Sequence, residues 1–158
     1  MNIIFYFAMG IFESFLVLSL GLSLINVRMS IKKLLFMSLL LLTVTILVRN
    51  IYSYYDISLG THSFIILFVE LIILIFIAKQ SLYNGIIAIL LSYLVLIICE
   101  YLITYNVFVI LNADPLALEG NYTLKGFIVL LTNILLLIVF YISYIRGFSI
   151  INLSKEAD

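Results

Sequence analysis

The chain has 158 residues, of which 66% are hydrophobic, whereas an ordinary soluble domain contains roughly 45–50% apolar residues. Its 8 Lys+Arg and 8 Asp+Glu are too few to cover the surface of a soluble protein of this size. These charges sum to zero and are dispersed along the chain, so no basic stripe is present and nucleic acid is excluded as an expected partner. The composition therefore predicts a protein that is surrounded by membrane lipid.

Five apolar stretches, each interpreted as a membrane-spanning helix, are separated by short polar connections. A span needs about 20 apolar residues, so these stretches account for most of the apolar composition. They are Ile3–Asn26, Leu34–Tyr52, Ser63–Ala78, Gly85–Phe108 and Gly126–Tyr144. The third is short and crosses a bilayer only if its helix tilts or the bilayer thins locally. The one proline, Pro115, follows the fourth stretch, so we expect unbroken helices.

The predicted fold class is all-α: a polytopic integral membrane bundle of about five transmembrane helices over residues 1–146, with a short cytoplasmic tail over 147–158. Residues 147–153 could continue the fifth helix as an output segment, but a frayed, solvated tail is the favoured interpretation. The chain begins with Met1-Asn2-Ile3-Ile4, without Lys or Arg before the first apolar stretch. We therefore interpret that stretch as a retained helix and not as a cleaved signal peptide.

The orientation follows from the basic residues, because Lys and Arg in short connections are retained on the cytoplasmic side of a membrane. With alternating helices, one side of the membrane receives Arg28, Lys32, Lys33, Lys79, Arg146 and Lys155. The other side receives Asp56, His62, Asp114 and Glu119, with Lys125 as the one cation in its connections. We predict an outside N-terminus and a cytoplasmic C-terminus in the cell (plasma) membrane.

No catalytic domain is expected in this sequence. The outer connections, residues 53–62 and 112–125, and the tail after Arg146 are too short to form a folded domain. The sequence has no serine nucleophile elbow, no phosphate-binding glycine loop and no zinc-protease motif. Its single cysteine, Cys99, excludes an internal disulfide and a multi-cysteine metal site. We expect no enzyme activity, no cofactor and no metal.

Four ionisable residues lie within predicted spans, where each costs a few kcal/mol unless it is paired, hydrated or displaced towards the interface. At about 1.5 Å per residue, Glu13 falls near mid-membrane, and Arg49, Glu70 and Glu100 fall in the outer half. Arg49 and Glu100 reach the same depth, so we expect an ion pair, because a guanidinium can offer a carboxylate two parallel hydrogen bonds. The alternative is that Arg49 extends outwards to the lipid headgroups. If the pair forms, Glu13 and Glu70 remain unneutralised, which favours a bound cation or a cationic ligand group.

Helical spacing places polar side chains on common faces. Tyr93, Glu100 and Thr104 share one face of the fourth helix, and Thr45 and Arg49 lie on one face of the second. We expect both faces to point into the bundle, where they would form a polar interior.

Small and hydrogen-bonding residues indicate where helices pack together. Gly10 and Ser14 flank Glu13 on the first helix, in a pattern that lets helices approach closely. Thr132 and Asn133 lie midway along the fifth helix, where we expect interhelical hydrogen bonds worth about 0.6–2 kcal/mol. These residues are predicted to support packing.

His62, the only histidine, lies at the outer end of the third helix. A group that titrates near neutral pH could sense protons or a ligand there, although a lone histidine is more often a satisfied interface residue. A transition-metal site built on it would need carboxylates such as Asp56 or Glu100.

Four short segments carry a resemblance to a known family: Phe12-Glu13-Ser14, Leu47-Val48-Arg49, Gly60-Thr61-His62 and Ile98-Cys99-Glu100. Their layout resembles the membrane input domain of AgrC-like and related bacterial sensor histidine kinases, whose cytoplasmic part is a GHKL-type kinase. The resemblance implies five to seven packed helices with very short loops. It also implies that a signal is sensed in the membrane or at its outer face.

The sequence departs from this family in one respect. The resemblance implies a kinase core after Arg146, and the residues from there to Asp158 contain none. His62 cannot replace the phospho-accepting histidine, because it is predicted to lie on the side of the membrane opposite to cytoplasmic ATP. We therefore expect this chain not to be a kinase by itself.

Three functions remain open from the sequence. The first is a signal-input or regulatory module, in which a ligand or ion in the outer half of the membrane biases two packings of the helices. Its expected partners are membrane lipid, a protein such as a sensor kinase or regulator, and a second copy of the chain in a homodimer. The second is a small substrate-binding, transport-related membrane subunit. The third is a structural assembly factor whose buried charges fix the register of the helices.

Overall fold

The computed structural model describes residues 3–55, 57, 61–111 and 122–153, and this part of the chain contains helices and no strand. The helices are α1 (Ile3–Leu24), α2 (Ile31–Tyr54), α3 (His62–Phe76), α4 (Leu82–Leu111) and α5 (Tyr122–Phe140), with a π-helical turn, η2 (Tyr141–Ile145), after α5. The predicted all-helical bundle is confirmed, and each helix lies within a few residues of the stretch that predicted it. Asp56, Asp114, Pro115, Glu119, Lys155 and the side chain of Lys125 lie outside the described residues.

Four helices are long and apolar enough to cross a membrane. These segments are Phe7–Leu24, Ile31–Tyr54, Leu82–Ile110 and Gly126–Ile145. Helix α3 has 15 residues, about 22 Å at 1.5 Å per residue, whereas the hydrocarbon core of a bilayer is about 30 Å thick. The five-span prediction is therefore supported for four helices, and the crossing of α3 stays a prediction.

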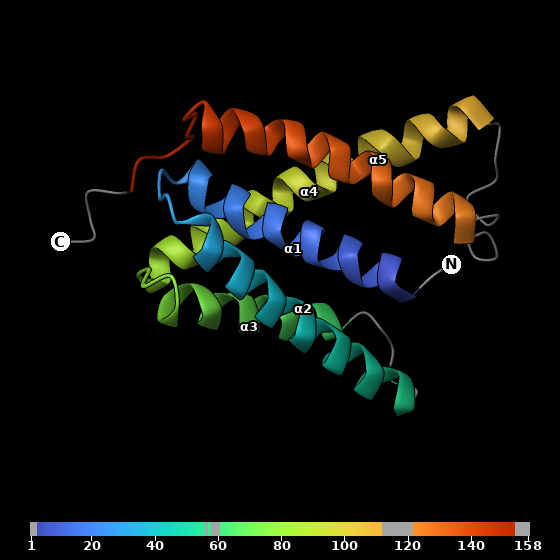
Figure 1. The fold of residues 1–158 in the computed structure, drawn as a ribbon, viewed down its shortest axis with the longest axis horizontal. Helices are drawn as coiled ribbons and strands as arrows, with labels where there is room; N and C mark the ends of the chain where they lie inside the picture. Colours follow the sequence, from blue (N-terminus) through green and yellow to red (C-terminus); the bar gives the residue numbers. More distant parts are fainter. Residues whose placement is uncertain (1–2, 56, 58–60, 112–121, 154–158) are drawn as a thin grey trace.

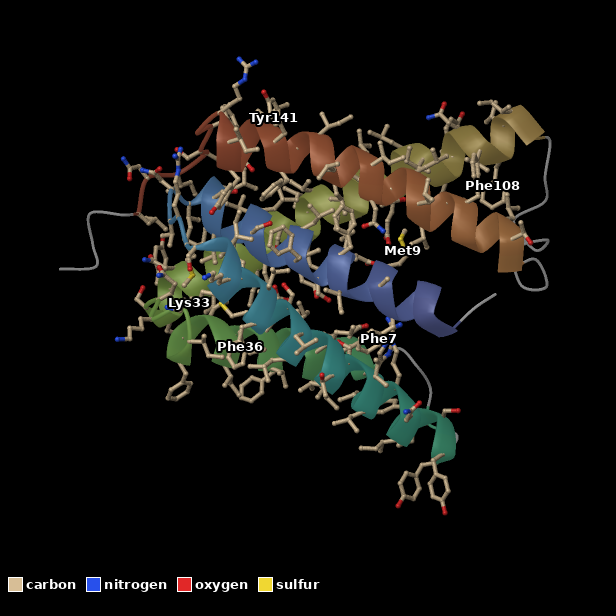
Figure 2. All side chains as sticks on the ribbon, in the orientation of Figure 1. Phe7, Met9, Lys33, Phe36, Phe108 and Tyr141 are labelled. Carbon is tan, nitrogen blue, oxygen red and sulfur yellow. The ribbon has the colours of Figure 1, made fainter. Side chains whose placement is uncertain are left out.

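Large apolar side chains cover the outside of the bundle (Figure 2). Phe36 on α2 and Phe68 and Phe76 on α3 are 54%, 64% and 75% exposed. A soluble monomer rarely exposes apolar surface on this scale, whereas lipid solvates it without cost. The surface is that of a membrane protein.

Successive helices run in opposite directions (Figure 1). The connections 25–30 and 77–81 and the segment 146–153 therefore lie at one end of the bundle. We call it the basic end, because its cations are Arg28, Lys32, Lys33, Lys79 and Arg146. The N-terminus lies at the opposite end (Figure 1).

Helix α1 is the central element, and it packs against α2, α4, α5 and η2 (Figure 1). All residues from Leu16 to Ile25 are buried. A Cβ atom on Gly21 would lie 2.6 Å from the carbonyl oxygen of Ala88, so the approach of α1 to α4 requires glycine at this position. The half of α1 towards the basic end is thus the most tightly packed part of the molecule.

Helix α1 ends in a Schellman motif with Asn26 in the left-handed conformation, at φ 64°. The N–H of Val27 donates to the carbonyl oxygen of Leu22 at 2.8 Å. The N–H of Asn26 donates to the carbonyl oxygen of Ser23 at 3.0 Å. This cap turns the chain towards α2 and leaves the carbonyl groups of Leu24 and Ile25 for other donors.

Residues 147–153, which we call the C-terminal strap, supply those donors. The N–H groups of Ile150 and Ile151 donate to the Leu24 carbonyl oxygen at 2.9 and 3.1 Å. The N–H of Leu153 donates to the carbonyl oxygen of Ile25 at 3.2 Å, and its side chain is buried. The segment does not continue the helix and is not frayed, because the end of α1 binds it, although most of its residues are exposed, as expected of a solvated tail.

Helix α5 continues without a break into the π-helical turn η2 at Tyr141, so Gly126–Ile145 is helical throughout. The wider turn coincides with two contacts to α1 and its connection. Ser23 Oγ donates to Ser143 Oγ at 2.9 Å, and the Tyr144 hydroxyl donates to the carbonyl oxygen of Met29. These bonds fix the end of α5 to the basic end of α1.

We predict that Gly21→Ala lowers the free energy of unfolding by about 1–3 kcal/mol, because the new methyl group meets the backbone of α4. Gly10→Ala is the matched control, since its Cβ would meet the end of the Leu42 side chain at 2.8 Å, and a side chain can rotate away. Thermal unfolding of the detergent-solubilised protein measures both variants. A Gly21→Ala variant as stable as wild type would contradict the close approach of α1 to α4.

Candidate functional site

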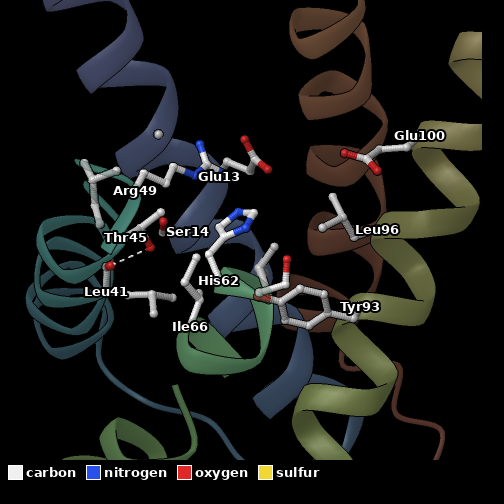
Figure 3. A pocket seen from close by; sticks show the side chains of 14 residues that line it. Glu13, Ser14, Leu41, Thr45, Arg49, His62, Ile66, Tyr93, Leu96 and Glu100 are labelled. Atoms are coloured by element: carbon white, nitrogen blue, oxygen red, sulfur yellow. Dashed lines mark hydrogen bonds between the residues drawn. The ribbon is translucent and has the colours of Figure 1, made fainter. Parts of the chain in front are cut away.

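Helices α1, α2, α3 and α4 surround a cavity of about 270 Å³, which we call the charged cavity (Figure 3). Its polar lining consists of Glu13, Ser14, Thr45, Arg49, His62, Ser63, Tyr93 and Glu100. Each of the four helices contributes one carboxylate, guanidinium or imidazole group, namely those of Glu13, Arg49, His62 and Glu100. The structure thus brings together four of the five candidate ligand or ion-pair residues.

The predicted ion pair between Arg49 and Glu100 is not formed. Both residues line the cavity, in agreement with their expected common depth, but among the described residues no nitrogen-to-oxygen contact of 4.0 Å or less joins them. Glu13 interacts electrostatically with both of these residues. Figure 3 shows Arg49 extending over the cavity towards Glu13, and Arg49 is an exposed residue, so the alternative contact with the headgroups stays a prediction. One guanidinium therefore faces two carboxylates.

His62 opens α3 at the edge of the charged cavity, and its Nδ1 is buried without a hydrogen-bond partner among the described residues. Its ring packs edge-on against that of Tyr52, with the ring centroids 6.0 Å apart. The Thr61 hydroxyl donates to the Tyr52 hydroxyl at 3.2 Å. These contacts join the end of α2 to the start of α3 and hold the imidazole beside the cavity.

Glu70 is the candidate residue that the structure places elsewhere. It is 1% exposed, lies between α3 and α4, and lines neither of the two cavities described for this part of the chain. Tyr93, which lines the charged cavity, interacts electrostatically with the Glu70 carboxylate. Its Oε2 has no hydrogen-bond partner among the described residues. Tyr93 therefore connects Glu70 to the cavity.

The packing candidates on α1 and α2 also line the charged cavity. Gly10 faces the Leu42 side chain on α2, and Ser14 lies one turn further along α1. The hydroxyl of Thr45 donates to the Leu41 carbonyl oxygen of its own helix at 2.8 Å (Figure 3). Small side chains here leave space between the helices.

A second cavity of about 260 Å³, the α5 cavity, lies on the other side of Glu13 and Glu100. Thr104 on α4 and Ile128, Val129, Thr132 and Asn133 on α5 complete its lining. Both carboxylates are shared with the charged cavity. The two cavities are therefore neighbours, separated by two acidic side chains.

The expected interhelical hydrogen bonds of Thr132 and Asn133 are not formed. These side chains are 5% and 3% exposed, and the Thr132 hydroxyl and both polar atoms of the Asn133 amide have no partner among the described residues. Both residues line the α5 cavity together with Glu13 of α1 and with Glu100 and Thr104 of α4, but none of these side chains forms a hydrogen bond to them. Sequence reasoning gave them a packing role and missed their position in a cavity lining.

The sequence spacing of the α5 residues that line this cavity could have shown that they share one face of the helix. Residues 128, 129, 132 and 133 follow the i, i+1, i+4, i+5 pattern of one helical side. Within the described residues, no three His, Cys, Asp or Glu side chains gather as a metal site requires.

Comparison of the chain with protein-family models, with curated proteins and with solved structures found no match.

Proposed function

We propose that this chain is an integral membrane signal-input or regulatory module, which binds a small ligand or ion in the charged cavity and acts on a cytoplasmic or membrane partner. The observation that carries the proposal is the meeting of Glu13, Arg49, His62 and Glu100, one from each of four helices, around one cavity. Ionisable side chains at membrane depth are costly, and they are retained mainly where a ligand, ion or proton uses them.

The charged cavity suits a ligand that carries both charge and hydrogen-bonding groups. The guanidinium of Arg49 offers a planar pair of donors to an anionic or carbonyl group. The two carboxylates accept from a cationic group, and the unpartnered Nδ1 of His62 offers a further polar contact. A ligand with these groups would connect all four helices.

The response would pass through α1. Ligand contacts at Glu13 act on the open half of α1, while its other half is fixed to α4, η2 and the C-terminal strap. A ligand that binds one helix arrangement better than another shifts the population towards it. The shift would then be detected by a partner at the basic end, where the cations of the short connections favour a cytoplasmic location. The N-terminus is outside in this arrangement.

Replacement of the one cavity cation tests the binding site. We expect Arg49→Gln to weaken binding of a small molecule that co-purifies with the protein, because a charge-assisted hydrogen bond contributes about 1.5–3 kcal/mol, roughly 10- to 150-fold in affinity. Native mass spectrometry of the protein extracted from its membrane measures the bound fraction. Asn50→Ala is the control, since Asn50 is exposed, adjacent in sequence and outside both cavity linings. If the bound fraction is unchanged and the melting temperature falls, Arg49 has a structural role.

The accompanying protein separates the proposed function from its alternatives. After mild extraction of the tagged chain, we expect a sensor kinase or regulator to co-purify at near-stoichiometric amounts, as identified by peptide mass spectrometry. An ATPase in its place would identify a transport-related subunit. Purification with neither partner nor small molecule would leave an assembly role and contradict the proposal.

Single cysteines test the orientation and the crossing of α3. In a Cys99→Ala background, Ser30→Cys, Tyr55→Cys and Ser81→Cys introduce exposed thiols in three different connections. We expect a membrane-impermeant maleimide applied to intact cells to label Tyr55→Cys and neither of the other two. Labelling of both Tyr55→Cys and Ser81→Cys, without Ser30→Cys, would show that α3 does not cross the membrane.

A further inference from the structure

We propose that the α5 cavity is a second binding site, and that it takes the ammonium group of a small organic amine. Glu13, Glu100, Thr104, Thr132 and Asn133 would surround the nitrogen, with Ile128 and Val129 against its carbon chain. The site does not depend on a ligand in the charged cavity, because its α5 and Thr104 contacts line the α5 cavity alone.

The polar atoms of the α5 cavity are matched to a cation with N–H donors. Two carboxylates, the hydroxyl groups of Thr104 and Thr132 and the side-chain amide of Asn133 belong to residues that line the same space. An ammonium group has three N–H donors and no acceptor. Since Arg49 does not line this cavity, no guanidinium competes for those acceptors within it.

The unpartnered atoms on α5 distinguish this cavity from a mere cluster of acidic residues. Thr132 and Asn133 are 5% and 3% exposed, and their polar atoms have no partner among the described residues. Buried polar groups are almost always hydrogen-bonded in folded proteins, so an unsatisfied pair that lines a cavity requires an explanation. A ligand in the cavity provides it once these side chains turn towards the ammonium, because the Thr132 hydroxyl and the Asn133 amide oxygen can then both accept from it.

The volume of the cavity argues for an organic cation over a bare metal ion. About 260 Å³ would hold about nine water molecules at roughly 30 Å³ each, far more space than one small ion fills. Ile128 and Val129 give the α5 side an apolar wall that a hydrated ion would not use. An ammonium on a short alkyl chain uses both the polar and the apolar parts of the lining.

Thermal unfolding of the full chain in detergent, with butylammonium chloride as the probe, tests the proposal. We expect butylammonium to raise the melting temperature of the wild type saturably. Equal concentrations of sodium chloride and of tetramethylammonium chloride should not do so, because neither cation has N–H donors. The double variant Thr132→Val and Asn133→Leu should lose most of the butylammonium shift, while Arg49→Gln should keep it. The Arg49→Gln variant tests binding in the charged cavity, and the double variant tests binding in the α5 cavity. One proposal can therefore fail while the other holds.

Two controls keep the result interpretable. Thr132→Val alone removes an unpartnered hydroxyl at nearly constant volume, so it tests the site if the double variant does not fold. Thr43→Val is the matched control, since its hydroxyl is exposed and donates to the Leu39 carbonyl oxygen of its own helix at 2.8 Å, and Thr43 lines neither cavity. An equal shift with sodium or tetramethylammonium would overturn the ammonium proposal. An undiminished butylammonium shift in Thr132→Val and in the double variant would overturn the assignment to the α5 cavity.

Discussion

The position of one carboxylate at the centre of the bundle governs the arrangement of the others. Glu13 is carried by α1, the helix that packs against α2, α4 and α5, so whatever satisfies its charge must come from a neighbouring helix or from a ligand. Arg49 and Glu100 interact with it from either side, and the sum of the three charges is negative. Because lipid cannot solvate such a group, the neighbouring helices leave polar cavities on both sides of it. The charged cavity and the α5 cavity therefore both border this one carboxylate inside the bundle.

The two halves of the bundle differ in packing. Towards the basic end, Gly21 lets the backbones of α1 and α4 meet, and the Ser23–Ser143 bond and the C-terminal strap fix the end of α1. Towards the opposite end the helices diverge (Figure 1), and both cavities lie on that side of the closely packed half. A tightly packed half transmits displacement, since close-packed interiors have low compressibility. The half with the cavities can accept a ligand, and the tightly packed half can transmit the resulting displacement to the basic end.

The sequence was sufficient for the helices and for the faces of α2 and α4, because hydropathy and helical spacing depend only on local order. Arg49, Tyr93 and Glu100 accordingly line one cavity, as their spacing indicated. The ion pair could not be predicted in the same way, since equal depth along two helices says nothing of the lateral distance between them, and here Glu13 lies between the partners. The strap was missed for a related reason. Its donors bind carbonyl groups at the end of α1, a pairing that no local pattern in residues 147–153 encodes.

The roles of Thr132 and Asn133 illustrate a limit of polarity arguments in membranes. A polar side chain on a spanning helix suggests a hydrogen bond to the next helix, because an unsatisfied group in hydrocarbon is costly. That inference assumes that the neighbouring helix offers a hydrogen-bonding group at that level. In this bundle both side chains are buried and line a space that two carboxylates border, but their polar atoms have no hydrogen-bond partner among the described residues. The same cost that would favour an interhelical bond then favours an occupant, and the two carboxylates of the lining favour a cation as the occupant that we propose.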